Sequence, residues 1–218
     1  DTFRKLAKNS KKDADILQDL EDALAMPSLE TSLMKWISRT PIMGSIYGSE
    51  NDSESVKKYV NEHLLAHKSM GEDATNRMSS YGTSDLEKMA QRFNAAHESA
   101  ISFLVPEGKI SRSRASLLFI ESYRELPLLA WPRKLIDAIV ELEESMVKWR
   151  HSHARMVERI MGRRIGTGGT SGVDYLDKTS QYRVFKDLWA VRTILVKSDK
   201  RPALINPDFY GFYLEKEA

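Results

Sequence analysis

The sequence predicts an all-α fold, and three observations lead to that prediction. Apolar residues recur at intervals of three and four along most of the 218 residues, as they do on one face of an amphipathic helix. No sustained alternation of apolar and polar residues bounded by turns is present, so no sheet is expected. The chain contains no cysteine, and 41% of its residues are hydrophobic. A chain of this length can bury a sizeable core without disulfide or zinc staples, so we expect one domain over residues 1–218.

Two helices and a loop are expected in the first 50 residues, ahead of a core over residues 51–200 and an irregular tail over 201–218. The first helix, over residues 13–26, carries Ile16, Leu17, Leu20 and Leu24 on one face. Pro27 stops it, and apolar residues continue after the break at Leu29, Leu33, Trp36 and Ile37. Between residues 40 and 53 the Pro, Gly, Ser and Asn content predicts a loop.

Five further helices follow from the same spacing. One over about residues 53–70 has an apolar stripe formed by Val56, Val60, His63, His67 and Met70. Ser84 and Glu87 form a capping box that opens a helix through Leu104, and the next helix is expected over residues 111–125. The longest helix runs over about residues 132–161, roughly 45 Å. Its expected inward face is Leu135, Ile139, Leu142, Met146, Trp149, His153, Met156 and Ile160. The last helix is expected over residues 182–196.

Composition excludes several classes of function. The chain has 33 Lys and Arg against 31 Asp and Glu, a formal net charge of +2, so nucleic acid is not an expected partner. No stretch approaches the roughly 20 apolar residues of a membrane span, and residues 1–12 lack the apolar core of a signal peptide. We therefore expect a cytoplasmic protein without a membrane partner. Without cysteine, any metal must be held by histidine or carboxylate.

Three histidines lie on predicted apolar stripes. His153 takes a place on the longest helix where Leu or Met would be typical, and a buried imidazole is either hydrogen-bonded within the core or bound to a ligand. His63 and His67 are four residues apart, so they could share a ligand or metal, although a two-histidine zinc site needs a third ligand. The alternative is that both are polar residues at a helix–helix contact.

The segment Gly166-Thr167-Gly168-Gly169-Thr170-Ser171-Gly172 follows the longest helix. It lacks a Gly-Lys-Ser/Thr sequence, so it is neither a Walker loop nor a dinucleotide fingerprint. Its glycines would let the backbone approach a carboxylate or an ammonium closely, whereas the alternative is a flexible connector.

At the end of the longest helix the sequence resembles the tryptophan 2,3-dioxygenase superfamily of histidine-ligated haem enzymes. The family pattern is Trp-Arg-x-x-His-x-x-Met-Val-Glu-Arg, then Gly-Thr-Gly-Gly-Ser-Ser-Gly and Tyr-Leu. This chain reads Trp-Arg-His-Ser-His-Ala-Arg-Met-Val-Glu-Arg from Trp149, then the Gly166 segment and Tyr175-Leu176. The likeness continues through residues 182–188, so it covers about the last third of the chain.

This resemblance implies a helical bundle enclosing haem b, with His153 as the iron ligand and Trp149 and Met156 beside the haem. It also implies that Thr167, with Gly166, contacts the amino-acid head group of the substrate. Tyr123-Arg124 matches the family's Phe-Arg, whose arginine binds the substrate carboxylate. His63 matches the distal histidine, and His67 is the other candidate for a catalytic proton-transfer residue.

Two departures from the family pattern guide the expected activity. The distal motif Thr-His-Gln-x-x-Glu is replaced by Glu62-His63-Leu64-Leu65-Ala66-His67, and no Ser-Gly-Phe-Gln-Ser run follows Arg124. These departures favour the branch of haem-dependent tyrosine hydroxylases, which would convert tyrosine to 3,4-dihydroxyphenylalanine with O2 or H2O2 in natural-product biosynthesis. The alternatives are a tryptophan 2,3-dioxygenase or related indole oxygenase, a non-catalytic haem sensor or carrier, and a plain helical interaction domain. The family likeness also implies a homo-oligomer.

Overall fold

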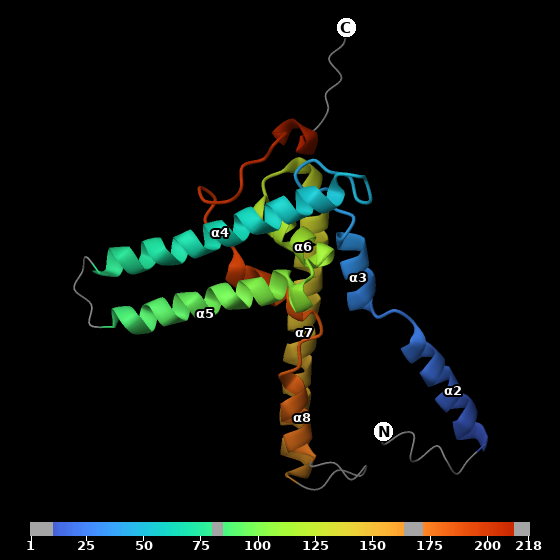
Figure 1. The fold of residues 1–218 in the computed structure, drawn as a ribbon. Helices are drawn as coiled ribbons and strands as arrows, with labels where there is room; N and C mark the ends of the chain where they lie inside the picture. Colours follow the sequence, from blue (N-terminus) through green and yellow to red (C-terminus); the bar gives the residue numbers. More distant parts are fainter. Residues whose placement is uncertain (1–10, 80–84, 164–171, 212–218) are drawn as a thin grey trace. The chain divides into compact units, whose positions relative to one another are not determined.

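The structure is a computed structural model that describes residues 11–79, 85–163 and 172–211. Within these ranges the chain forms helices and no strand (Figure 1), which confirms the all-α prediction. The α-helices are α2 (Lys11–Ala25), α3 (Leu29–Ile37), α4 (Asp52–Ser79), α5 (Leu86–Leu104), α6 (Arg112–Ser122), α7 (Ala130–Met161), α8 (Val173–Ser180) and α9 (Lys186–Ala190). Short 3-10 turns are η1 (Pro106–Gly108), η2 (Pro127–Leu129), η3 (Val191–Ile194) and η4 (Pro207–Tyr210).

The chain divides into two compact units, which are described separately. Unit 1 consists of Asp1–Leu33 and Val140–Val184, and unit 2 consists of Met34–Ile139 and Phe185–Ala218. The single domain expected from the sequence stays a prediction.

The core of unit 2 forms around α6. Seven consecutive residues of this helix, from Ala115 to Glu121, are buried, and Phe119 packs edge-on against Tyr59 of α4 with ring centroids 5.3 Å apart. Ser111 is the N-cap of α6 and its hydroxyl accepts from the backbone N–H of Arg114. The helix ends at Ser122, three residues earlier than the sequence predicts.

The helices α4 and α5 form a long pair in unit 2 and lie side by side (Figure 1). Gly71 permits their close approach, because a Cβ at this position would lie 3.2 Å from the Cβ of Phe93. Helix α4 extends nine residues beyond the predicted end at about Met70. The N-cap of α5 is Asp85, without a side-chain capping bond, and Ser84 of the predicted capping box lies outside the described residues.

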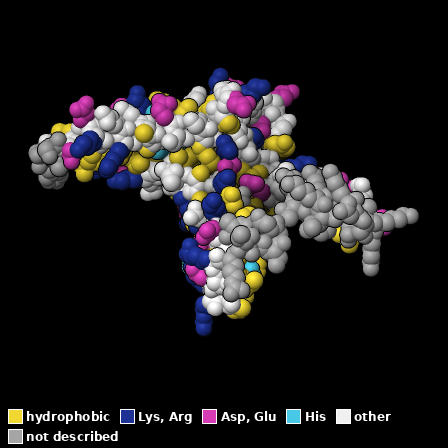
Figure 2. Space-filling view, turned by 90° about the horizontal axis from the view of Figure 1, so that it is seen from below, with side chains coloured by type: hydrophobic (Ala, Val, Ile, Leu, Met, Phe, Trp, Pro, Cys, Tyr) yellow, Lys and Arg dark blue, Asp and Glu magenta, His cyan; other side chains and the backbone are white. Residues whose placement is uncertain are grey.

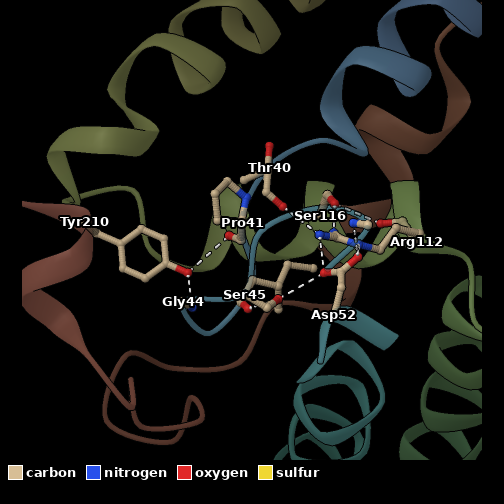
Figure 3. A network of polar contacts seen from close by, with 10 residues as sticks. Thr40, Pro41, Gly44, Ser45, Asp52, Arg112, Ser116 and Tyr210 are labelled. Carbon is tan, nitrogen blue, oxygen red and sulfur yellow. Dashed lines mark hydrogen bonds and ion pairs between the residues drawn. The ribbon is translucent and has the colours of Figure 1, made fainter. Parts of the chain in front are cut away.

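A buried ion pair fixes the segment that leads into α4 (Figure 3). Arg112 donates through Nη2 to Asp52 Oδ1 at 3.0 Å and to the carbonyl of Thr40 at 2.9 Å. Ser45 donates to the same Asp52 oxygen at 3.0 Å. Burial alone would raise the pKa of Asp52, but these hydrogen bonds, with one from the Gly48 backbone, hold it below its usual value. The network therefore sets where α4 begins.

The carboxyl-terminal segment of unit 2 also contacts the loop before α4. Tyr210 is fully buried, donates its hydroxyl to the carbonyl of Pro41 at 3.1 Å, and accepts from the N–H of Gly44 at 2.8 Å (Figure 3). This contact joins positions more than 160 residues apart in the sequence, and it fixes Tyr210, within the predicted tail, against the loop before α4.

The predicted last helix, over residues 182–196, is wrong at its start. The carbonyl of Tyr182 accepts from Arg150 at 2.9 Å, and the N–H of Val184 donates to Glu143. Because these backbone groups bond to side chains of α7, they do not enter a helix. Helical structure begins only at Lys186, and α8 was not predicted.

The prediction of which face of α7 is buried is also wrong. Helix α7 ends where predicted, since Gly162 follows it with φ +65° and donates to the carbonyl of Glu158. Five of the eight residues expected to face inward are exposed: Leu142, Met146, Trp149, Met156 and Ile160. The buried positions include Ile136, Val140, Glu143 and Ala154 instead. The apolar stripe is therefore available for something other than the core of this chain.

Candidate functional site

His153 lies on the exposed apolar stripe of α7, within unit 1. Its ring is half-buried and stacks on Trp149 one turn earlier, with ring centroids 5.4 Å apart and planes 8° apart. No hydrogen bond or ion pair of this ring involves a residue in the described ranges. The imidazole is thus held by stacking alone, and its nitrogens remain available to a ligand.

The side chains around His153 form an exposed apolar face. Trp149 is 66% exposed and Ile160 78% exposed, and Met146 and Met156 lie on the same face. In the space-filling view hydrophobic side chains lie at the surface among charges of both signs (Figure 2). A porphyrin needs a flat apolar contact surface and an axial ligand such as imidazole, so these residues fit it.

Ion pairs join α7 to α8 just beyond the candidate iron ligand. Arg155 pairs with Asp177 and Glu158, and Arg163 contacts Asp174 at 3.2 Å. The bond from Arg155 lowers the pKa of Asp177. These pairs hold α8 along the final turns of α7.

His63 lies on the buried face of α4 in unit 2. Its ring is fully buried, and Nε2 donates to the carbonyl of Ile194 at 2.9 Å, because a carbonyl oxygen can only accept. Burial lowers the pKa of His63 from 6.5 to about 4, against a smaller opposing effect of the hydrogen bond. The imidazole is therefore neutral at pH 7, with Nδ1 as its remaining acceptor.

His67 lies one turn further along α4 and is 7% exposed. Its ring stacks on His97 of α5, with centroids 5.7 Å apart. The Nδ1 atoms of both rings are buried and have no hydrogen-bond partner within the described part of the chain. Burial, followed by the proximity of His97, lowers the pKa of His67. In the described ranges no group of three or more His, Asp or Glu could hold a metal ion.

Arg124 and Tyr123, the predicted substrate-binding pair, follow the end of α6. Arg124 is exposed and its Nη2 donates to Asp137 at 3.1 and 3.3 Å. Tyr123 is 1% exposed, donates its hydroxyl to the carbonyl of Pro202, and lies beneath the guanidinium of Arg201. Burial raises the pKa of Tyr123. Of the pair, only Arg124 presents its polar end at the surface.

The predicted site residues are thus distributed over both units. His153, Trp149 and Met156 belong to unit 1, whereas His63, His67, Tyr123 and Arg124 belong to unit 2. Gly166 and Thr167 lie outside the described residues. Sequence reasoning missed Asp137, Glu121 and Ile194, of which the first two contact Arg124 and the third contacts His63. Glu121 lies three residues before Arg124, a helical spacing that the sequence could have revealed, whereas Ile194 lies 131 residues from His63 and has no local signal.

An all-helical chain with an imidazole in an exposed apolar helix face has the features of a histidine-ligated haem protein. Comparison with known proteins agrees: the family model described as tryptophan 2,3-dioxygenase matches residues 3–195. The chain belongs to the tryptophan 2,3-dioxygenase family. Enzymes of this family use haem as their cofactor.

Three relatives show the extent of the similarity. A "Tryptophan 2,3-dioxygenase-like protein" of Xanthomonas campestris pv. campestris strain 8004 is 41% identical, with 87% of this chain and 72% of that protein aligned. "Tryptophan 2,3-dioxygenase 2" of Ralstonia nicotianae is 42% identical over 85% of this chain and 52% of that protein. "Tryptophan 2,3-dioxygenase" of Sorangium cellulosum is 42% identical over 87% and 48%. The chain thus spans about half the length of the last two relatives.

These findings confirm the resemblance inferred from the residues around His153. The tyrosine-hydroxylase branch stays a prediction. Within the described ranges, no helix combines the length and apolarity required to cross a membrane.

Proposed function

We propose that the protein is a haem-dependent oxygenase that acts on an aromatic amino acid with O2, and that tryptophan or a related indole is its substrate. One observation carries the proposal: the imidazole of His153, unpaired within the described residues, on an exposed apolar face of α7. Family membership and the names of the relatives support it.

His153 would bind the iron through a neutral ring nitrogen, with Trp149 fixing the plane of the ring by stacking. Met156 and Trp149 would contact the porphyrin faces and exclude water from that side. A bound haem supplies the oxidation chemistry, and the chain supplies the ligand and the apolar surface.

Arg124 would bind the substrate carboxylate, because its guanidinium is exposed and presents paired donors. Thr167, with Gly166, would contact the ammonium end of the substrate. Tyr123 would act indirectly: its buried contact with Pro202 fixes the segment from which Arg124 extends. In well-oriented reactions such positioning of the reacting groups lowers the barrier by about 7–11 kcal/mol.

Proton transfer would fall to His63 or His67. The Nε2–H of His63 is engaged with Ile194, which leaves Nδ1 as a weakly basic acceptor. The Nδ1 of the stacked ring of His67 likewise has no hydrogen-bond partner among the described residues. We propose that one of these neutral imidazoles accepts the proton released from the substrate during oxidation.

Tyrosine hydroxylation is the second candidate, favoured by the altered distal motif from Glu62 to His67 and by the absence of the Ser-Gly-Phe-Gln-Ser run after Arg124. A product assay separates the two: purified holoprotein is incubated with tryptophan or tyrosine, with O2 plus reductant or with H2O2. Formation of N-formylkynurenine supports the first proposal, and 3,4-dihydroxyphenylalanine supports the second. Haem binding without either product supports a sensor or carrier.

The iron ligand is tested with two neighbouring histidines. His153→Ala should fold, as judged by circular dichroism, but fail to retain stoichiometric haem. His151→Ala is the matched control, because His151 lies on the same helix and is exposed. A normal Soret band and turnover in His153→Ala would refute the assignment. Light scattering of the holoprotein tests the proposed homo-oligomer.

A further inference from the structure

Five ionisable side chains gather around the proposed carboxylate-binding residue, all within unit 2. This arginine cluster consists of Arg124, Arg133, Arg192, Glu121 and Asp137. Arg124 contacts Asp137 through Nη2 and Glu121 through Nε at 3.7 Å. Arg192 approaches the same Asp137 oxygen at 3.7 Å, and Arg133 donates to the carbonyl of Arg124 at 2.9 Å.

The two carboxylates of the cluster differ in their surroundings. The side chain of Glu121 is 2% exposed, and its Oε1 has no hydrogen-bond partner within the described ranges. The side chain of Asp137 is 39% exposed, and Arg124 is 43% exposed. Glu121 is therefore a fixed support beneath Arg124, whereas Asp137 is a surface partner that can move.

The contact between Arg124 and Asp137 leaves the guanidinium incompletely used. Both carboxylate oxygens of Asp137 approach a single nitrogen, Nη2, at 3.1 and 3.3 Å. A fork-to-fork pair would use two nitrogens and be stronger. The cluster also holds three guanidinium groups against two carboxylates, so it has one positive charge in excess. Both features suit one additional carboxylate.

We propose that Asp137 occupies Arg124 in the substrate-free protein, and that the substrate carboxylate displaces Asp137 toward Arg192. This inference rests on the proposed role of Arg124. Asp137 is then a specificity-determining residue, because only a ligand with a carboxylate can compete for the guanidinium. Arg192 keeps the displaced carboxylate of Asp137 paired, so the displacement costs little free energy. Since exposed ion pairs are weak, the competition should reduce substrate affinity by no more than about fivefold.

The test compares the affinity of full-length holoprotein for tryptophan and for tryptamine, which lacks the carboxylate, by isothermal titration calorimetry. Asp137→Asn keeps the shape and removes the charge, so it should lower the Kd for tryptophan by about two- to fivefold and leave that for tryptamine unchanged. Asp73→Asn is the matched control: Asp73 is an exposed carboxylate paired with Lys200 at 3.0 Å, away from the cluster. It should change neither Kd.

Arg192→Ala provides a second, opposite readout. Without Arg192 the displaced Asp137 loses its second partner, so the Kd for tryptophan should rise while that for tryptamine stays constant. An unchanged or higher Kd for tryptophan in Asp137→Asn would overturn the inference. A higher value would mean that Asp137 itself contacts the substrate, for example its ammonium group.

Arg124→Ala separates this inference from the proposed function. Loss of a charged partner should raise the Kd for tryptophan by about 30-fold or more. If Arg124→Ala has no effect, or if wild-type holoprotein binds no tryptophan, the proposed role of Arg124 fails and the displacement fails with it. If Arg124→Ala weakens binding but Asp137→Asn does not change it, only the displacement is refuted.

Discussion

Acid should destabilise the protein through His63, whose ring is buried and neutral. The pKa of His63 is about 4 in the folded chain and 6.5 when the ring is exposed by unfolding. The unfolded state therefore takes up a proton as the pH falls through 6.5, whereas the folded state does so only near 4. Stability from this residue is complete above pH 6.5 and is lost between pH 6.5 and 4.

The magnitude follows from the two pKa values. A fall from pH 7 to pH 5 should reduce the free energy of unfolding by about 2 kcal/mol, and the full loss at lower pH approaches about 3 kcal/mol. His67 adds to the loss in the same direction, since burial lowers its pKa too. An exposed histidine with the same pKa in both states would contribute nothing.

Urea unfolding followed by circular dichroism at pH 7, 6 and 5 measures this effect. His63→Gln is the informative variant, because its side-chain amide can still donate to the carbonyl of Ile194 but does not titrate. Its free energy of unfolding should fall by about 2 kcal/mol less than that of the wild type over this range. His151→Gln, at an exposed position, should retain the wild-type pH dependence. If His63→Gln loses as much stability as the wild type, the buried neutral state of His63 is refuted.

Three further perturbations test the fold and the apolar face. Arg112→Met leaves the carboxylate of Asp52 buried without its cation, so the free energy of unfolding should fall by about 2–4 kcal/mol in urea titrations. Trp149→Gln, at a side chain 66% exposed, should change stability by less than about 1 kcal/mol yet weaken retention of added hemin several-fold, as measured by Soret titration. Gly71→Leu should destabilise by about 1–3 kcal/mol because Phe93 lies too close, whereas Gly71→Ala should stay near neutral. Equal unfolding curves for both Gly71 variants would contradict the close packing of α4 and α5.

Helix positions could be predicted from the sequence wherever local signals decide them. Helix α7 ends at Met161 as predicted, and α6 begins close to its predicted start, because the positive φ of Gly162 and the side-chain acceptor of Ser111 act within one helical turn. The prediction of a helix over residues 182–184 was wrong, because the backbone of this segment is hydrogen-bonded to Arg150 and Glu143 of α7. Those partners lie 32 and 41 residues away, beyond the reach of any local pattern.

The α7 stripe shows a second limit of sequence patterns. Apolar spacing correctly grouped Met146, Trp149, His153 and Met156 on one face, but spacing cannot reveal what covers that face. In this chain Met146, Trp149 and Met156 are exposed and His153 is half-buried, while a neighbouring stripe that includes Glu143 is buried. A hydrophobicity pattern does not predict that a charged residue such as Glu143 is buried. Its carboxylate accepts from the N–H of Val184, a hydrogen bond that offsets part of the cost of burial.

His63 and His153 illustrate both limits of sequence patterns. Both lie on predicted apolar stripes, but their environments in the structure differ. His63 is buried and donates to the carbonyl of Ile194, 131 residues away, whereas the ring of His153 stacks on Trp149 and has no hydrogen bond to any residue that the structure describes. Similar placement on an apolar stripe therefore produces a ring with one nitrogen hydrogen-bonded to the backbone in one case, and the ring that we propose as the iron ligand in the other. The two rings differ in whether a backbone acceptor lies within hydrogen-bonding distance. Helical periodicity does not show this difference, because the acceptor of His63 lies 131 residues away in the sequence.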